Sequence, residues 1–217
     1  MIEEFLKTDF VEYLNNRRPA NLPEWTTVPS IQKEIITDKV FDITDLHNSG
    51  GSIKRPKGQG EATYHNNDLY IPCFVSYDDF LSQFRTYDEN ERIEKDWATG
   101  IKRADYLVYD KSEEKKFFII HELSKGSKRN KRSKGIKQLI DTVSTLWNQT
   151  GIKTYIENTF SNLLCYLSTK RIIKGTPLSM ADGFLDIYKQ IPKAVAITNL
   201  EFELKGFKAF ETNLVEL

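Results

Sequence analysis

The chain has 217 residues, of which 39% are hydrophobic and 29% charged. This balance is typical of a folded protein and excludes the low-hydrophobicity composition of a disordered one. Its 31 Lys and Arg residues equal its 31 Asp and Glu residues in number, so no global positive field attracts nucleic acid. Any contact with a polyanion must therefore come from a local basic patch.

The cysteines and the first residues indicate the compartment. Cys73 and Cys165 lie far apart in apolar segments, as buried reduced thiols do. Residues 1–14 are acidic and amphipathic, without the basic start and apolar core of a signal peptide. No apolar run approaches the roughly 20 residues that span a bilayer. We therefore expect a cytoplasmic protein with no membrane partner.

The first part of the chain mixes helical and extended patterns. Apolar residues at helical spacing predict a helix over residues 2–16, which prolines within residues 17–25 end. A short helix is predicted from Ser30, a suitable N-cap, and an extended segment follows over residues 40–46. Residues 48–67 are rich in glycine, lysine and polar side chains without periodicity, and predict a long surface loop.

A hairpin is the clearest supersecondary signal in the sequence. Before it, residues 68–75 read as a buried strand, a helix should begin near Ser76, and the charged run 88–96 should continue or follow that helix. Two strand-like runs then follow, residues 104–110 and 116–123, joined by a short polar turn. These two runs predict an antiparallel pair.

The segments after the hairpin complete the predicted fold. An apolar stripe at helical spacing predicts a helix over residues 126–149, and the nearly continuous apolar run 162–171 predicts a central strand. A helix over residues 181–190 and late strands within 194–198 and 208–217 are also expected. The order strand, strand, helix, strand indicates an α/β fold with a mixed central sheet and a core hairpin flanked by helices.

We expect one domain over residues 1–217, because its length fits a single core. Within it, residues 1–100 form an N-terminal elaboration and residues 101–217 form the core that carries the hairpin.

Two acidic residues are predicted to meet across the hairpin. In simple register about the polar turn, Asp105 lies opposite Glu122 on the same face. Like charges at this separation repel unless a cation lies between them, and carboxylate oxygens favour Mg²⁺ or Mn²⁺. The alternative is a pair of ordinary solvated carboxylates, or partners for nearby Arg103 and Lys116.

The hairpin and its acidic residues resemble the PD-(D/E)xK nuclease superfamily, whose fold is restriction-endonuclease-like. The resemblance covers residues 102–170 and rests on Ala104–Asp105, with alanine where the family has proline, and on the segment Glu122–Leu123–Ser124–Lys125. It implies that Asp105 and Glu122 hold Mg²⁺ (or Mn²⁺). It also implies that Lys125 helps to position or activate the attacking water in metal-assisted phosphodiester hydrolysis.

The lysine of the motif is displaced by one position. Ser124 stands where the family has lysine, and in a regular strand Ser124 shares the face of Glu122 while Lys125 points away. Lys125 can reach the site if the strand ends or bulges after Ser124. Lys134 or Lys137 of the following helix is the alternative source of the ammonium group.

A basic segment follows the acidic pair without one acidic residue. A run of this kind suits contacts to a phosphate backbone, although a solvated helix entry or an acidic partner explains it equally. A second basic stretch, residues 54–57, lies in the predicted loop. The residues that we assign to nucleic-acid binding are Lys128, Arg129, Lys131, Arg132, Lys134 and Lys137.

Other residues near the pair carry weaker signals. His121 alternates away from Glu122, which favours a packing role. Glu91 and Glu94 are candidates for a third metal ligand, but their charged surroundings favour a solvated face, and they stay outside the predicted site.

Three functional hypotheses follow. The first is a Mg²⁺-dependent DNA endonuclease of restriction or defence type, with DNA preferred to RNA as partner and a homodimer expected if both strands are cut. The second is a catalytically inactive nucleic-acid-binding or protein-interaction domain of the same fold. The third is a structural or interaction protein without nucleic acid, which the zero net charge favours. The displaced lysine separates the first from the second.

Overall fold

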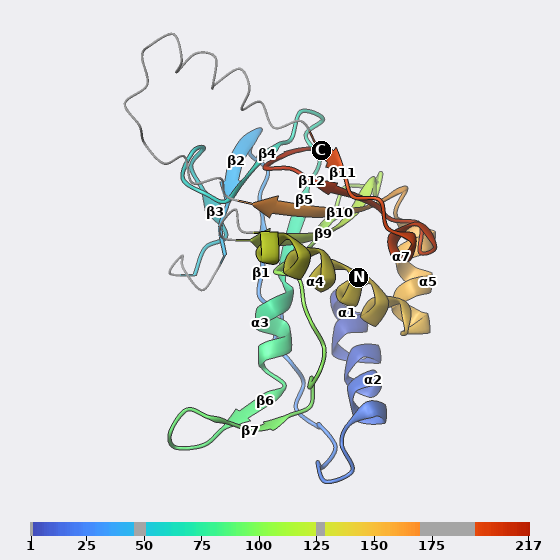
Figure 1. Ribbon diagram of the computed structural model, residues 1–217. Helices are drawn as coiled ribbons and strands as arrows, with labels where there is room; N and C mark the ends of the chain where they lie inside the picture. The colour runs from blue at the N-terminus through green and yellow to red at the C-terminus, as the bar shows by residue number, and fades with distance from the viewer. Residues whose placement is uncertain (1, 46–50, 125–128, 170–193) are drawn as a thin grey trace.

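A computed structural model describes residues 2–45, 51–124, 129–169 and 194–217 (Figure 1). Its centre is a seven-stranded mixed sheet with helices on one face, which confirms the predicted mixed α/β class. The strand order is β1-β5-β8-β9-β10-β12-β11. The bounds are β1 (Lys33–Ile35), β5 (Pro72–Ser76), β8 (Tyr106–Asp110), β9 (Phe117–Ser124), β10 (Asn162–Thr169), β11 (Val195–Ala196) and β12 (Lys208–Glu211).

The predicted hairpin is confirmed as β8 and β9. These strands pair antiparallel with Tyr106 opposite His121 and Leu107 opposite Ile120. The chain then crosses over through α4 (Arg129–Trp147) and α5 (Thr150–Thr159), and β10 returns parallel to β9. Because both faces of β9 are covered, all eight of its residues are buried, as expected of a strand in the middle of a layered fold.

Two apolar cores lie on the two faces of this sheet. Alternate residues of β9 serve them: Phe118 and Ile120 pack in the helical core, while Phe117 and Ile119 pack against a second sheet. The helical core contains side chains from α1 (Ile2–Lys7), α2 (Asp9–Arg17), α3 (Tyr77–Ser82), α4 and α5. The second sheet has the order β13-β4-β2-β3, with β2 (Val40–Ile43), β3 (Lys54–Arg55), β4 (Ala62–His65) and β13 (Leu214–Glu216).

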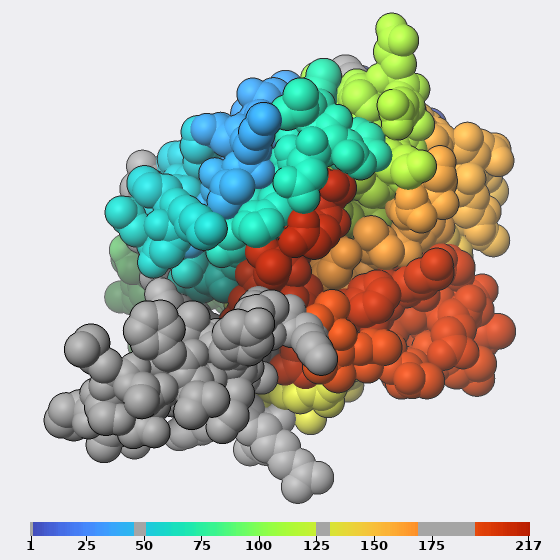
Figure 2. Space-filling view, turned by 90° about the horizontal axis from the view of Figure 1, so that it is seen from above, coloured from blue at the N-terminus to red at the C-terminus, as the bar shows by residue number. Residues whose placement is uncertain are grey.

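The strand β13, from the last residues of the sequence, completes the second sheet. β13 pairs parallel with β4, with Leu214 opposite Thr63. Seen from above in Figure 2, the last residues, in dark red, lie between the cyan segments of the second sheet and the orange segments of the later part of the chain. Among the described residues, no helix is both long and apolar enough to cross a membrane.

Two predictions in the first half of the chain are wrong. The segment after Ser30 forms β1 rather than a helix, because it gains backbone hydrogen bonds by pairing with β5. The predicted loop 48–67 contains β3 and β4, and β4 buries Ala62 and Tyr64 in the second core; residues 46–50 lie outside the described part. Such short strands are stabilised by long-range pairing, which local periodicity does not reveal.

The charged run 88–96 is also corrected. α3 begins at Tyr77, as predicted, but it ends at Ser82. The chain then forms β6 (Arg85–Tyr87) and β7 (Ile93–Asp96), a separate two-stranded sheet with an irregular register at Thr86 and Tyr87.

The remaining helices begin or end at other residues than the sequence predicts. The N-terminal helix is divided into α1 and α2 at Thr8, and the helix after the hairpin ends at Trp147 before α5 begins. The short α7 (Leu200–Glu203) was not predicted, whereas the late strands appear as β11, β12 and β13. The helix expected over residues 181–190 lies outside the described residues. β1 and β5, from the first hundred residues, belong to the same sheet as the hairpin.

Candidate metal and nucleic-acid site

The acidic pair lies where the hairpin ends. One step beyond the pair Tyr106 and His121, the antiparallel register places Asp105 across from Glu122. Oδ2 of Asp105 accepts a hydrogen bond from the backbone N–H of Leu123 at 2.6 Å. The carbonyl of Asp105 accepts from the N–H of Tyr77 at 2.9 Å. Asp105 is thus held between the second strand of the hairpin and the start of α3.

Glu122 lies beneath α4 on the helical face of the sheet. It is only 5% exposed, and its Oε2 accepts a hydrogen bond from Nε2 of Gln138 at 3.2 Å. Helix α4 approaches closely at Gly135, where an added Cβ would lie 2.6 Å from a methyl of Leu167 and 3.4 Å from Cγ of Glu122. A glycine at this position lets the helix cover the carboxyl group, and Gln138 fixes its orientation.

The surroundings of Glu122 oppose its ionisation. Burial is the largest cause, and the charges of Asp105 and then Asp78 act in the same direction; together they raise the pKa of Glu122 to about 10. Lys134 acts in the opposite direction and lowers it. Glu122 therefore holds a proton at neutral pH unless a cation arrives to compensate the ionised form.

Asp78 is an acidic residue of this site that the sequence analysis missed. It lies in the first turn of α3, forms an ion pair with Arg103, and its charge raises the pKa of Glu122. The earlier candidates Glu91 and Glu94 belong to the β6–β7 region, where Glu94 accepts a hydrogen bond from Thr86. The predicted start of a helix near Ser76 was the available signal for Asp78.

The potential ligand set consists of carboxylate oxygens. Asp105 and Glu122 are its centre, and Asp78 and Asp45 are near enough for their charges to act on Glu122. Within the described part of the chain, no group of three or more His, Cys, Asp or Glu side chains is arranged to hold a metal ion. Two carboxylates still suit Mg²⁺, which keeps several waters and takes the rest of its ligands from substrate phosphates.

The predicted basic residues divide into three groups. Lys125 and Lys128 lie outside the described residues, and Arg129 is the first residue of α4. Lys131, Arg132, Lys134 and Lys137 are exposed on the same helix. Of these, Arg132 donates from Nε to Glu211 of β12 at 2.6 Å, while Lys134 is the cation whose charge acts on Glu122.

His121 points to the opposite face of β9, as its alternation with Glu122 predicts. Its Nδ1 lies 2.6 Å from the hydroxyl of Tyr64, and its Nε2 lies 2.8 Å from the hydroxyl of Ser168. Ser168 in turn donates to the carbonyl of Thr212. Complete burial lowers the pKa of His121 to about 3, so the ring is neutral and joins the two sheets.

Comparisons of the chain with protein-family models, curated proteins and solved structures gave no match. Functional inference therefore rests on the geometry of these residues.

Proposed function

We propose that the protein is a Mg²⁺-dependent nuclease, with a restriction-endonuclease-like core, that hydrolyses phosphodiester bonds. The observation that carries the proposal is the burial of Glu122 beside Asp105 at the end of the hairpin. Holding two carboxylates together in a poorly solvated place is unfavourable without a cation, and perturbed carboxylates of this kind concentrate at functional sites.

The chain's own residues fit a divalent ion. Asp105 and Glu122 would hold Mg²⁺ (or Mn²⁺), Gln138 orients Glu122, and the ammonium group of Lys134 supplies positive charge near both the metal ligands and an incoming phosphate. When bound, the ion supplies an acidic water and neutralises charge on the phosphate. Lys125, to which the resemblance assigns this role, is the other source of the ammonium group and lies outside the described residues.

The topology also supports this proposal. An antiparallel hairpin carrying one acid on each side, followed by a helix, is the arrangement that the resemblance to the PD-(D/E)xK superfamily implies. In this chain the helix α4 covers the second acid, and β10 returns parallel to β9.

Several finer features belong to the same proposal. We take DNA as the preferred substrate, a defence or restriction role as the setting, and a homodimer as the form that cuts both strands. The buried and unpaired state of Cys73 and Cys165 supports a reducing compartment such as the cytoplasm.

The second candidate function is an inactive domain of the same fold that binds nucleic acid or a protein. It is favoured by Ser124, which is buried on β9 at the position where the family carries its lysine. Cleavage of nucleic acid is expected of the first candidate alone.

A cleavage assay separates them. Plasmid DNA, linear duplex, single-stranded DNA and RNA are incubated with the protein in Mg²⁺, Mn²⁺ or EDTA. The nuclease proposal predicts cleavage that requires the ion and is lost in both Asp105→Asn and Glu122→Gln. The matched control is Glu114→Gln, which removes an exposed carboxylate of the hairpin turn and should cut like the wild type. Cleavage by Glu122→Gln at the wild-type rate would assign the chemistry elsewhere.

A further inference from the structure

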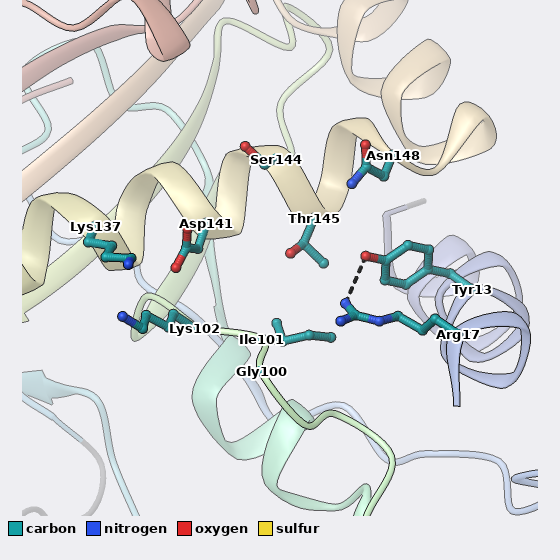
Figure 3. A pocket seen from close by; sticks show the side chains of 10 residues that line it. All are labelled: Tyr13, Arg17, Gly100, Ile101, Lys102, Lys137, Asp141, Ser144, Thr145 and Asn148. Carbon is teal, nitrogen blue, oxygen red and sulfur yellow. Dashed lines mark hydrogen bonds between the residues drawn. The ribbon is translucent and has the colours of Figure 1, made fainter. Parts of the chain in front are cut away.

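A polar groove lies between α2, α4 and the segment that leads into β8 (Figure 3). Its volume is about 330 Å³. Three cationic side chains line it, each from a different one of these segments: Arg17, Lys102 and Lys137. Asp141 is the one carboxylate among its lining residues, so positive charge predominates.

The cations occupy two ends of this groove. Figure 3 shows Lys102 and Lys137 close together at one end and Arg17 beside Tyr13 at the other, with Ile101 between them. Arg17 donates to the hydroxyl of Tyr13 at 3.0 Å, and its guanidinium lies 5.4 Å from the centre of that ring. Tyr13 thus holds the arginine in place over the groove.

The end formed by the two lysines is unfavourable without an anion. Contact with the ammonium group of Lys137 lowers the pKa of Lys102, and the charge of Lys134 acts in the same direction, while Asp141 opposes both. Within the described part of the chain, neither Lys102 nor Lys137 forms an ion pair, and the same holds for Arg17. Such a gathering of cations suits a phosphate group.

Hydrogen bonds of residues next to the groove lead to the candidate metal site. Gln138, which follows Lys137 on α4, donates both to Glu122 and to the carbonyl of Arg103, the residue after Lys102. Lys137 is therefore next to the hydrogen-bond partner of Glu122, and Lys102 is next to the residue whose carbonyl binds the same amide.

We propose that this groove binds the phosphodiester backbone of the strand that reaches Asp105 and Glu122. One phosphate lies at Lys102 and Lys137, and another, further along the strand, lies at Arg17. The inference rests on the proposed nuclease function and adds to it a contact surface that includes the N-terminal helices. Hydroxyl and amide groups of Ser144, Thr145 and Asn148 line the same groove and suit phosphate and sugar oxygens.

Binding titrations test the groove without cleavage. Labelled duplex and single-stranded oligonucleotides are titrated with the wild type, Arg17→Ala and Lys102→Ala in EDTA at several KCl concentrations. Each variant should weaken binding several-fold. Because one phosphate contact is lost, the negative slope of log K against log salt should become shallower by about one. Arg17→Lys keeps the charge and should keep most of the slope.

Lys116→Ala is the matched control. Lys116 is an exposed lysine just before the start of β9, about 20 Å along the strand from Glu122, and its removal should leave the slope unchanged. An equal loss in Lys116→Ala and Lys102→Ala would show a general charge effect and overturn the groove.

The remaining outcomes distinguish this inference from the proposed function. Metal-dependent cleavage with wild-type binding by Arg17→Ala and Lys102→Ala overturns the groove and leaves the nuclease intact. A chain that neither binds nor cuts any nucleic acid overturns both. Inorganic phosphate is the third arm: if it shifts the amide NMR signals of Gly100 and Ile101 while oligonucleotides do not bind, the groove is a small-anion site and the strand contact is wrong.

Discussion

His121 and Glu122 are consecutive residues of β9, both buried and both titratable, yet their surroundings differ completely. Between the two sheets, both ring nitrogens of His121 meet hydroxyl groups, and the ring is neutral. Beneath α4, Glu122 meets one amide and the charges of Asp105 and Asp78. On one face of β9, the imidazole ring of His121 has hydrogen-bond partners for both nitrogens. On the other face, the carboxyl group of Glu122 lies near carboxylates of the same charge.

This difference separates the packing role of His121 from the role in metal binding that we propose for Glu122. A buried polar group with neutral partners specifies how two layers meet at little net cost. A buried carboxyl group beside other carboxylates contributes nothing comparable to stability, since burial and the neighbouring negative charges oppose its ionised form more than Lys134 favours it. The comparison therefore places His121 in the architecture of the fold and supports the role that we propose for Glu122.

We expect the largest effect on cleavage from the lysine whose charge acts on Glu122. Lys134→Ala should lower single-turnover cleavage by roughly 10²–10³-fold, about 3–4 kcal/mol, because its charge stabilises negative charge that develops in the transition state. Lys125→Ala is measured beside it, with saturating enzyme. If Lys125→Ala is inactive and Lys134→Ala cuts normally, the displaced lysine of the motif stabilises the transition state and the lysine of α4 does not.

The next prediction concerns the contribution of His121 to the stability of the fold. His121→Leu should destabilise the fold by about 1–3 kcal/mol, because the buried hydroxyl of Tyr64 loses its partner. Urea unfolding monitored by tryptophan fluorescence measures the change. Combining it with Tyr64→Phe should recover part of the loss, and a double variant no more stable than His121→Leu would contradict the pairing.

A smaller effect is the pH dependence of stability. Because the pKa of Glu122 is raised, the folded state binds more protons than the unfolded state above the ordinary glutamate pKa. Stability without metal should therefore fall as pH rises from about 7 to 9, by at most about 1.4 kcal/mol per unit. His121 is neutral in the folded state, and in the unfolded state, with an ordinary pKa of about 6.5, it has lost most of its proton by about pH 7.5, so it adds little over this range. Glu122→Gln should abolish the slope in thermal melts, and an unchanged slope would place the titrating group elsewhere.

The smallest expected effect lies on the basic face of α4. Glu211→Gln removes the partner of Arg132, an exposed pair that contributes about 0–1 kcal/mol to stability. The released guanidinium should strengthen oligonucleotide binding slightly at low salt. The double variant Glu211→Gln with Arg132→Ala should show no gain, and a gain that persists there would mean that Arg132 is not the residue responsible.

Parts of the fold follow from the sequence because local pattern and tertiary role agree. The hairpin strands and β10 are apolar runs buried on both faces, and α4 shows its buried stripe of Leu139, Val143 and Leu146. β1 could not be predicted from its own residues, since its strand form depends on pairing with β5.

The site was predictable to a similar degree. Hairpin symmetry alone places Asp105 opposite Glu122. The burial of Glu122 depends on the close approach of α4 at Gly135, and the nearness of Asp78 depends on how α3 meets the hairpin. Both features depend on distances between segments that are far apart in the chain. The periodicity and spacing of residues do not predict such distances.

The proposed function depends on the claim that Asp105 and Glu122 share one divalent cation, which calorimetric titration with Mn²⁺ at about pH 7.5 measures. Titrations in buffers of different ionisation enthalpy also count the protons released. Because Glu122 is protonated before the ion arrives, we predict one Mn²⁺ per chain with the release of about one proton, and the loss of both in Glu122→Gln. Binding that is unchanged in Glu122→Gln and Asp105→Asn, or no binding by the wild type, would contradict the claim.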